Sequence, residues 1–170
     1  MKTLLLFSVM PLLVVVVLSG CCSSTVTTII FVRHGERLNN TDTTSLSVPG
    51  LQRAAALRHV LDSTAISRIF VTEKRRTKQT AQPTAAAHSL TPIEIPEAET
   101  PRLVDSLRAH LGQTMLVVGH SNTVPQAIEL LGVSPPPTIG GTEFDKLFIL
   151  SLRSQGGTRL TKLQYGVPSP

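Results

Sequence analysis

The stretch Ile29-Ile30-Phe31-Val32-Arg33-His34-Gly35-Glu36 indicates both the type of fold and the place of its chemistry. Its first four residues are apolar and rich in β-branched side chains, which predicts a buried strand. An arginine and a histidine follow directly where this strand ends. Burial penalises cationic side chains unless an anion compensates them, so the pattern favours a binding site at this strand end over a simple turn.

Strands and helices alternate along the rest of the chain. Apolar runs predict strands at 29–32, 68–71, 93–95, 115–119, 146–152 and 158–165, and helical spacing predicts helices at 51–61, 75–87, 102–111 and 123–131. This alternation predicts one domain over residues 29–170, in which helices cover both faces of a mostly parallel sheet of about six strands.

Polar side chains follow three of the predicted strands. These strand ends read Arg33-His34-Gly35, Thr72-Glu73-Lys74 and Gly119-His120-Ser121-Asn122, and Arg75 and Arg76 open the helix after the second. Ligands of open α/β sheets bind beyond the carboxyl ends of the strands. Arginines bind phosphate through paired hydrogen bonds, and a neutral imidazole can attack phosphorus to form a phosphohistidine. The sequence therefore predicts a phosphate site that contains a histidine nucleophile.

Three motifs, Arg33-His34-Gly35-Glu36, Arg76-Thr77-Lys78-Gln79-Thr80-Ala81 and Gly119-His120, resemble in order and spacing those of the histidine phosphatase superfamily, also called phosphoglycerate mutase-like. The resemblance implies a three-layer α/β/α sandwich and a metal-independent phosphatase that acts through a phosphohistidine and uses no cofactor. The short insertions are similar to those of small bacterial phosphohistidine phosphatases, whose pocket is uncapped. The segments 39–49, 96–101 and 140–144 are the expected pocket walls.

The resemblance also implies roles for individual residues. His34 would be the nucleophile, and His120 would donate to the phosphate and stabilise charge in the transition state. Arg33 and Arg76 would hold the phosphate; Arg76 is preferred to Arg75 because it directly precedes the Thr77-Lys78-Gln79-Thr80 run. Asn40 would be a further phosphate ligand, with Asn39 as the alternative.

The general acid is where the sequence departs from its relatives. Ser121 stands where the acid phosphatase branch has an aspartate after the second histidine. The mutase-like branch has a glutamate after the third strand, in the region that corresponds to 96–100 here. We therefore expect Glu99 to be the acid, with Glu97 as the alternative. A good leaving group would make a strong acid less necessary.

Composition excludes several classes of site and partner. Cys21 and Cys22 are the only cysteines, so residues 29–170 hold no disulfide and no thiolate site. No third histidine or carboxylate stands at ligand spacing beside His34 and His120, so no metal site is expected. Aromatic residues are 4% of the chain and the formal charge is +5, which favours a small phosphorylated substrate or a phosphoprotein over nucleic acid. A non-catalytic phosphate-binding protein and, less favoured, a phosphomutase are the alternatives.

The N-terminal segment predicts export. Lys2 precedes an apolar run over 4–18, which is typical of a signal peptide and shorter than the about 20 residues of a membrane-spanning helix. Leu18-Ser19-Gly20-Cys21 resembles the bacterial lipobox. We therefore expect a signal peptide at 1–20, a lipidated Cys21, a tether at 21–28 and attachment to a bacterial envelope membrane; an ordinary signal peptide and secretion is the alternative.

Overall fold

The structure is a computed structural model that describes residues 25–153 and 157–169. The predicted signal peptide and Cys21 lie outside these residues. The strands are β1 (Val26–Arg33), β2 (Arg68–Val71), β3 (Ile93–Glu94), β4 (Thr114–Gly119), β5 (Lys146–Arg153) and β6 (Arg159–Gln164). The helices are α1 (Val48–Leu61), α2 (Arg75–Ala87), α3 (Thr100–Arg108) and α4 (Thr123–Leu130), and a short 3-10 turn, η1, spans Glu97–Glu99. Among the described residues, no helix is long and apolar enough to cross a membrane.

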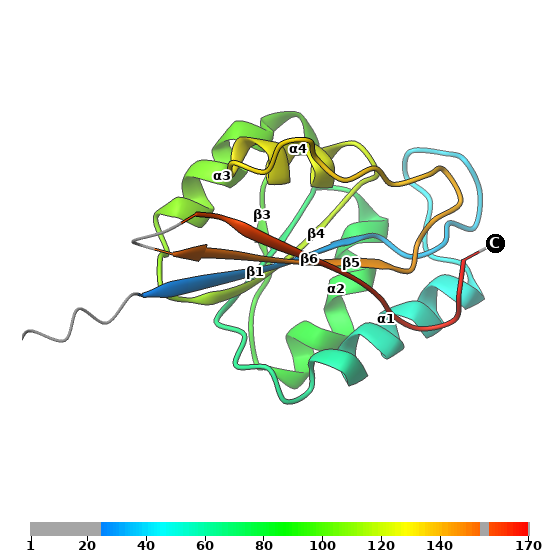
Figure 1. Cartoon of the computed structure of the whole chain (residues 1–170). Helices are drawn as coiled ribbons and strands as arrows, with labels where there is room; N and C mark the ends of the chain where they lie inside the picture. The colour runs from blue at the N-terminus through cyan, green and yellow to red at the C-terminus, as the bar shows by residue number, and fades with distance from the viewer. Residues whose placement is uncertain (1–24, 154–156, 170) are drawn as a thin grey trace, which may run out of the picture.

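The strands form one sheet in the order β3-β2-β4-β1-β5-β6. The first four are parallel to one another, whereas β5 pairs antiparallel with both β1 and β6. Helices α1 and α2 cover one face, and α3 and α4 cover the other (Figure 1). The predicted three-layer α/β/α sandwich with a mostly parallel sheet is confirmed.

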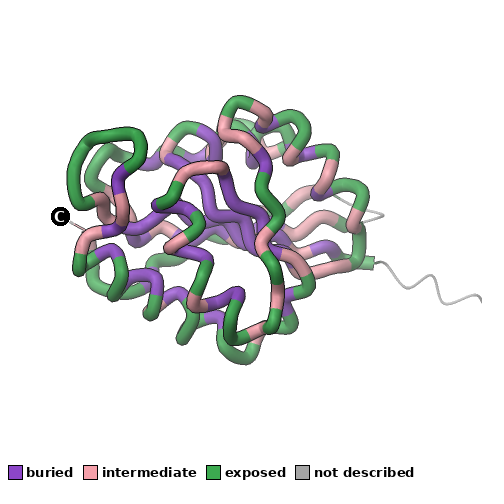
Figure 2. Tube along the Cα trace, turned by 180° about the vertical axis from the view of Figure 1, so that it is seen from behind, coloured by how far each residue is buried: buried purple, intermediate pink, exposed green. Residues whose placement is uncertain are grey.

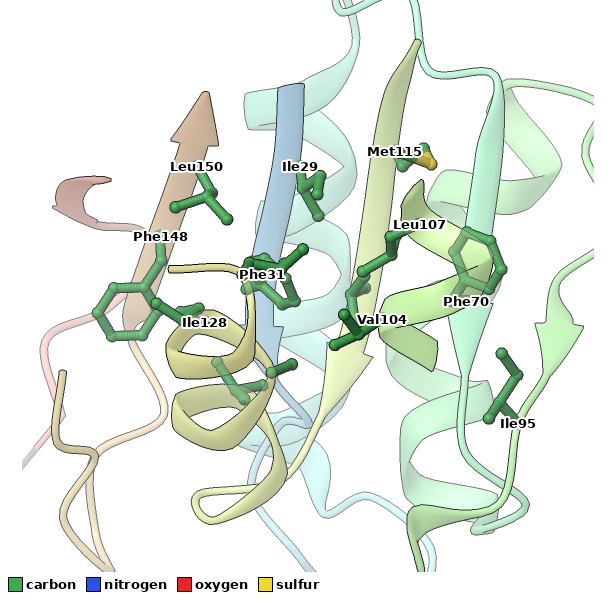
Figure 3. Close-up of a cluster of buried hydrophobic side chains, with 14 of the residues drawn as sticks. Ile29, Phe31, Phe70, Ile95, Val104, Leu107, Met115, Ile128, Phe148 and Leu150 are labelled. Carbon is green, nitrogen blue, oxygen red and sulfur yellow. The ribbon is translucent and has the colours of Figure 1, made fainter. Parts of the chain in front are cut away.

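Each face of the sheet has its own apolar layer. Side chains alternate between the faces of a strand, so Ile29 and Phe31 of β1 join the layer under α3 and α4, while Ile30 and Val32 join the layer over α1 and α2. Figure 3 shows the first of these layers, and Figure 2 shows the buried strands between more exposed helices and loops. Burial on both faces explains why the central strands are continuous apolar runs.

Several element boundaries differ from the predictions. β1 begins at Val26, so residues 26–28 of the predicted tether belong to the sheet, where Thr28 pairs with Thr114. Helix α1 begins at Val48 because the Ser47 side chain caps it by accepting a hydrogen bond from the Gly50 amide, with proline in the first turn. Helix α3 begins two residues early, directly after η1, and ends three residues early at Arg108.

The sheet order places the three polar strand ends together. β4 lies between β1 and β2, and Arg33 is in register with Gly119, so that His34 and His120 follow neighbouring strands. Val71, the last residue of β2, is paired with Val118 of β4. The predicted convergence of these strand ends at one edge of the sheet is thereby confirmed.

Candidate active site

Two buried imidazoles form the centre of the candidate site. The backbone N–H of His34 donates to the carbonyl of Gly119 at 3.0 Å, which continues the pairing of β1 with β4. The ring centroids of His34 and His120 are 5.3 Å apart, with the rings inclined at 64°. The two residues are only 3% and 5% exposed. The structure thus brings together the two histidines that the motifs single out.

The surroundings of His34 fix its tautomer. Its Nδ1 lies 2.7 Å from the carbonyl oxygen of Gly35. A carbonyl can only accept, so Nδ1 carries the hydrogen and the Nε2 of the neutral ring keeps its lone pair. Burial, followed by the nearby His120, Arg33 and Arg76, lowers the pKa of His34 to about 3. His34 is therefore neutral near pH 7, with an unprotonated nitrogen available for nucleophilic attack.

The loop after His34 is held by both helices on its face of the sheet. The amide of Gly35 donates to the Thr80 hydroxyl of α2 at 3.0 Å. The backbone of Gly35 also lies against Gly50 in the first turn of α1, where an added Cβ would approach the Gly50 carbonyl oxygen to 2.8 Å. Only glycine permits this approach, so the third residue of the Arg33-His34-Gly35 motif is required by packing.

Arg33 is a buried cation that has a buried donor without a partner. Its Nη1 donates to the carbonyls of Gly140, Gly141 and Glu143 at 2.8, 3.0 and 2.9 Å. Its guanidinium carbon lies 4.0 Å from the ring centroid of Phe144. Burial lowers the pKa of Arg33 to about 10, which still leaves it charged near pH 7. Its Nε is buried and has no hydrogen-bond partner among the described residues.

Arg76 repeats this pattern at the start of α2. Its Nη1 donates to the carbonyl of Asp42 at 2.9 Å, and its Nε is buried with no partner in the part of the chain that the structure describes. Buried donors are almost always satisfied in folded proteins. Two unused guanidinium donors beside two imidazoles therefore suit an anion with several acceptor oxygens. Arg75, the neighbouring alternative, is exposed.

His120 lies between a threonine and a glutamate. Its Nε2 is 3.0 Å from the Thr72 hydroxyl and 3.2 Å from a carboxylate oxygen of Glu97. Burial, followed by the charge of Arg76, lowers the pKa of His120 to about 4, although the charge of Glu73 opposes this shift. A bound phosphate would favour the protonated ring, which would make His120 a donor to the substrate.

The geometry favours Glu97 over Glu99 as the general acid. Glu97 contacts His120 and lies 3.6 Å from Lys74, whereas Glu99 forms an ion pair with Arg102 at 2.7 Å. The two glutamates occupy one 3-10 turn with three residues per turn, so side chains two positions apart point in different directions. Glu97 is therefore the better placed of the two candidates, and the role of either glutamate as the acid stays a prediction.

Asp42, in the loop after β1, contacts the site, although the sequence analysis did not predict a role for it. Asp42 accepts from Arg76 through its carbonyl and from Lys74 through its carboxylate, the latter at 2.7 Å. Asn40 is exposed and has no side-chain hydrogen bond within the described ranges, and the Asn39 side chain accepts from Thr41. The role of Asn40 stays a prediction.

The lowered pKa values make stability depend on pH. Both His34 and His120 titrate in the folded protein at about 3 to 4, below the about 6.5 of an unfolded chain. Between these values the unfolded chain binds more protons, so the free energy of unfolding should fall as pH drops from about 6.5 to about 4. The measurement is the midpoint of urea unfolding as a function of pH. As pH drops, the midpoint should fall less steeply for His34→Gln and His120→Gln than for the wild type, whereas His59→Gln, which changes an exposed histidine, should follow the wild type. The same pH dependence in all variants would contradict burial of neutral rings.

Comparison with known proteins places these features in context. A family model described as the histidine phosphatase superfamily (branch 1) matches residues 29–99. No curated protein matches the sequence. Similar solved structures include the protein histidine phosphatase SixA complexed with tungstate (19% identity, 81% of this chain, 96% of that chain, TM-score 0.66).

Two further structures have comparable likeness. A mycobacterial glucosyl-3-phosphoglycerate phosphatase shares 15% identity over 83% of this chain and 100% of its own, with a TM-score of 0.66. A putative alpha-ribazole-5'-P phosphatase from Escherichia coli shares 18% over 83% and 98%, with a TM-score of 0.62. At such low identity these structures establish a common fold.

Proposed function

We propose that the chain is a member of the histidine phosphatase superfamily, whose model matches residues 29–99, and that it is a phosphatase that forms a phosphohistidine at His34. One observation carries the proposal: His34 has a free Nε2 beside two buried arginines, Arg33 and Arg76, whose Nε donors have no partner among the described residues. The substrates would be phosphomonoesters or phosphoramidates. The names of the similar structures, which include a protein histidine phosphatase and a sugar-phosphoglycerate phosphatase, support this class without choosing within it.

The reaction would proceed in two steps. His34 Nε2 attacks phosphorus and the P–O or P–N bond to the leaving group breaks, while the two guanidiniums and His120 stabilise charge on the phosphoryl oxygens. Glu97 gives its proton to the leaving group. In the second step Glu97 takes a proton from water, the water attacks the phosphohistidine, and phosphate leaves as His34 is restored.

The proposed reaction needs no metal ion because arginines neutralise the phosphate charge. In the described ranges, no group of three or more His, Cys, Asp or Glu side chains is arranged to hold a metal. Phosphate release from a panel of aryl and alkyl phosphates and phosphoramidates, with a chelator present, tests the proposal. A phosphohistidine that forms without turnover would favour the binding protein. The 3.2 Å contact of Glu97 with His120 supports the enzyme, because it places a candidate acid beside the site.

The role of Glu97 predicts a dependence on the leaving group. Glu97→Gln should slow the hydrolysis of alkyl phosphates by roughly 10² to 10⁴, the usual contribution of general acid catalysis. Aryl phosphates should be affected little because their leaving groups depart without a proton. Glu99→Gln, two positions away and paired with Arg102, is the matched control and should retain wild-type rates on both substrates. Equal losses on both substrates for Glu97→Gln would argue against an acid role.

We also propose that the protein acts in the cell envelope, held by a lipid on Cys21. The described chain starts next to Val26 at the amino end of β1, whereas His34 follows the carboxyl end of this 8-residue strand (Figure 1). Such a strand spans about 26 Å. An anchor before Val26 would therefore hold the amino end of the sheet near the membrane and leave the site facing away from it, toward soluble substrates.

Lipidation predicts a change in location on mutation. Cys21→Ser should move the protein from the membrane fraction to the soluble fraction, because acyl chains provide the membrane affinity. Cell fractionation and mass spectrometry of the N-terminus measure this result. Cys22→Ser is the matched control and should stay in the membrane fraction. Wild-type protein that is wholly soluble with an unmodified N-terminus would contradict the proposal.

A further inference from the structure

Arg53 is a buried arginine of α1 that takes no direct part in the proposed reaction. Its Nε lies 3.0 Å from both carboxylate oxygens of Glu36, and its Nη2 lies 2.6 Å from one of them. Its remaining hydrogen bonds go to the carbonyls of Tyr165 and Val167, at 3.1 and 3.0 Å. One guanidinium thus joins α1, the loop after the nucleophile and the C-terminal segment.

Glu36 connects this arginine to His34. The carbonyl of Glu36 accepts hydrogen bonds from the amide and hydroxyl of Ser47, at 2.9 and 3.2 Å. With its side chain and backbone both held, Glu36 limits the movement of the preceding peptide. The carbonyl of that peptide belongs to Gly35 and accepts the Nδ1–H of His34. Arg53 is therefore connected to the acceptor of the His34 Nδ1–H through Glu36 and Gly35.

The far end of the C-terminal segment reaches the other side of the nucleophile. The hydroxyl of Ser169 accepts the backbone N–H groups of Phe144 and Asp145, at 2.8 and 3.1 Å. The Phe144 ring packs on the guanidinium of Arg33 at 4.0 Å, and its centroid lies 6.0 Å from that of His34. After β6 the chain runs beside α1 (Figure 1), so one short segment contacts both supports of the site.

We propose that Arg53 and the segment Tyr165–Ser169 are positioning elements of the active site. Arg53 holds His34 through Glu36, and Ser169 holds Phe144 against Arg33. The inference rests on the proposed phosphatase, because the function of the positioned groups is phosphoryl transfer. Small displacements of reacting groups have large effects on rate, with about 10²-fold lost for a 1 Å shift.

The test compares single-turnover phosphorylation of His34 by an aryl phosphate in matched variants. Arg53→Ala should form the phosphohistidine about 10²-fold more slowly, and Arg53→Lys should recover part of the rate because it keeps a cation beside Glu36. Arg58→Ala removes the exposed arginine that pairs with Asp62 on the same helix and should match the wild type. Ser169→Ala should weaken binding of inorganic phosphate as well as slow the reaction, since it loosens Phe144 beside Arg33.

A second measurement does not depend on turnover. NMR of the His34 ring nitrogens should show one tautomer, protonated at Nδ1, in the wild type and a mixture in Arg53→Ala. If Arg53→Ala does not fold, Arg53→Lys decides the role of Arg53 through the same tautomer measurement, and Ser169→Ala decides the role of the C-terminal segment. Folded variants with wild-type rates and a single tautomer would overturn the inference. Wild-type protein that is never phosphorylated would instead contradict the proposed phosphatase, and the tautomer comparison would still decide the positioning role.

Discussion

Replacement of His34 by alanine is expected to abolish the phosphohistidine and to lower turnover on the order of 10⁴ to 10⁶-fold, as when a nucleophile or its partner is removed from other enzymes. The physical reason is that His34 is the buried imidazole of the described residues whose tautomer leaves Nε2 free. Its Nε2 is the free nitrogen of a neutral ring, whereas the Nε2 of His120 is engaged by Thr72 and Glu97. The measurement is labelling by a radioactive aryl phosphate, together with steady-state rates.

A matched control separates this loss from damage to the fold. His59 is an exposed histidine on α1, so His59→Ala should retain wild-type labelling and turnover. His34→Ala should keep its circular dichroism spectrum, because the alanine removes a ring from the edge of the sheet and leaves both apolar layers intact. Undiminished labelling of folded His34→Ala would refute the assignment of the nucleophile.

The second large effect is expected for Arg76. Arg76→Ala removes a buried cation and its unused Nε donor, and loss of one such transition-state contact lowers kcat by about 10² to 10³-fold. Affinity for inorganic phosphate should fall as well. Arg76→Lys should recover only part of the rate, because lysine keeps the charge but lacks the fork of donors that matches phosphate oxygens.

The adjacent arginine provides the control for this prediction. Arg75 precedes Arg76 at the start of the same helix but is exposed. Arg75→Ala changes the net charge equally, so it should alter rates only slightly, through long-range attraction that salt screens. If Arg75→Ala and Arg76→Ala lose activity equally, the loss comes from the change in net charge and not from a contact of Arg76 with phosphate.

Much of the fold could be predicted because burial leaves a plain pattern in the sequence. The run Met115-Leu116-Val117-Val118 is buried on both faces of the sheet, which is why it is apolar throughout. The start of α1 could not be placed by apolar spacing, since it depends on a cap at Ser47. Which strands pair also depends on contacts between distant residues, as for β1 with β5.

The candidate site also contains residues that could be predicted from the sequence and one choice that could not. His34, His120, Arg33 and Arg76 could be predicted because each lies at or next to the end of a strand or the start of a helix, where topology alone brings them together. The choice between Glu97 and Glu99 could not be predicted, since it depends on the directions of two side chains within one turn.

The contact of Arg53 with the C-terminal segment could not be predicted from the sequence either. It joins residues 112 and 114 positions apart, and no local pattern encodes such a pairing. Only a three-dimensional structure shows that the chain end lies beside the nucleophile loop. Residues that position a site from a distance in sequence are therefore found by contacts and not by motifs.

The central claim is that His34 Nε2 carries the phosphoryl group during turnover. The most direct measurement is to quench the wild-type protein during hydrolysis of an aryl phosphate, under alkaline conditions that preserve phosphohistidine, and to locate the phosphate by peptide mapping and by NMR of the ring nitrogens. We predict a single modified residue, His34, phosphorylated at Nε2 with Nδ1 still protonated. Phosphate on His120 or on a hydroxyl or carboxylate, or rapid turnover with no phosphorylated residue at all, would contradict this account.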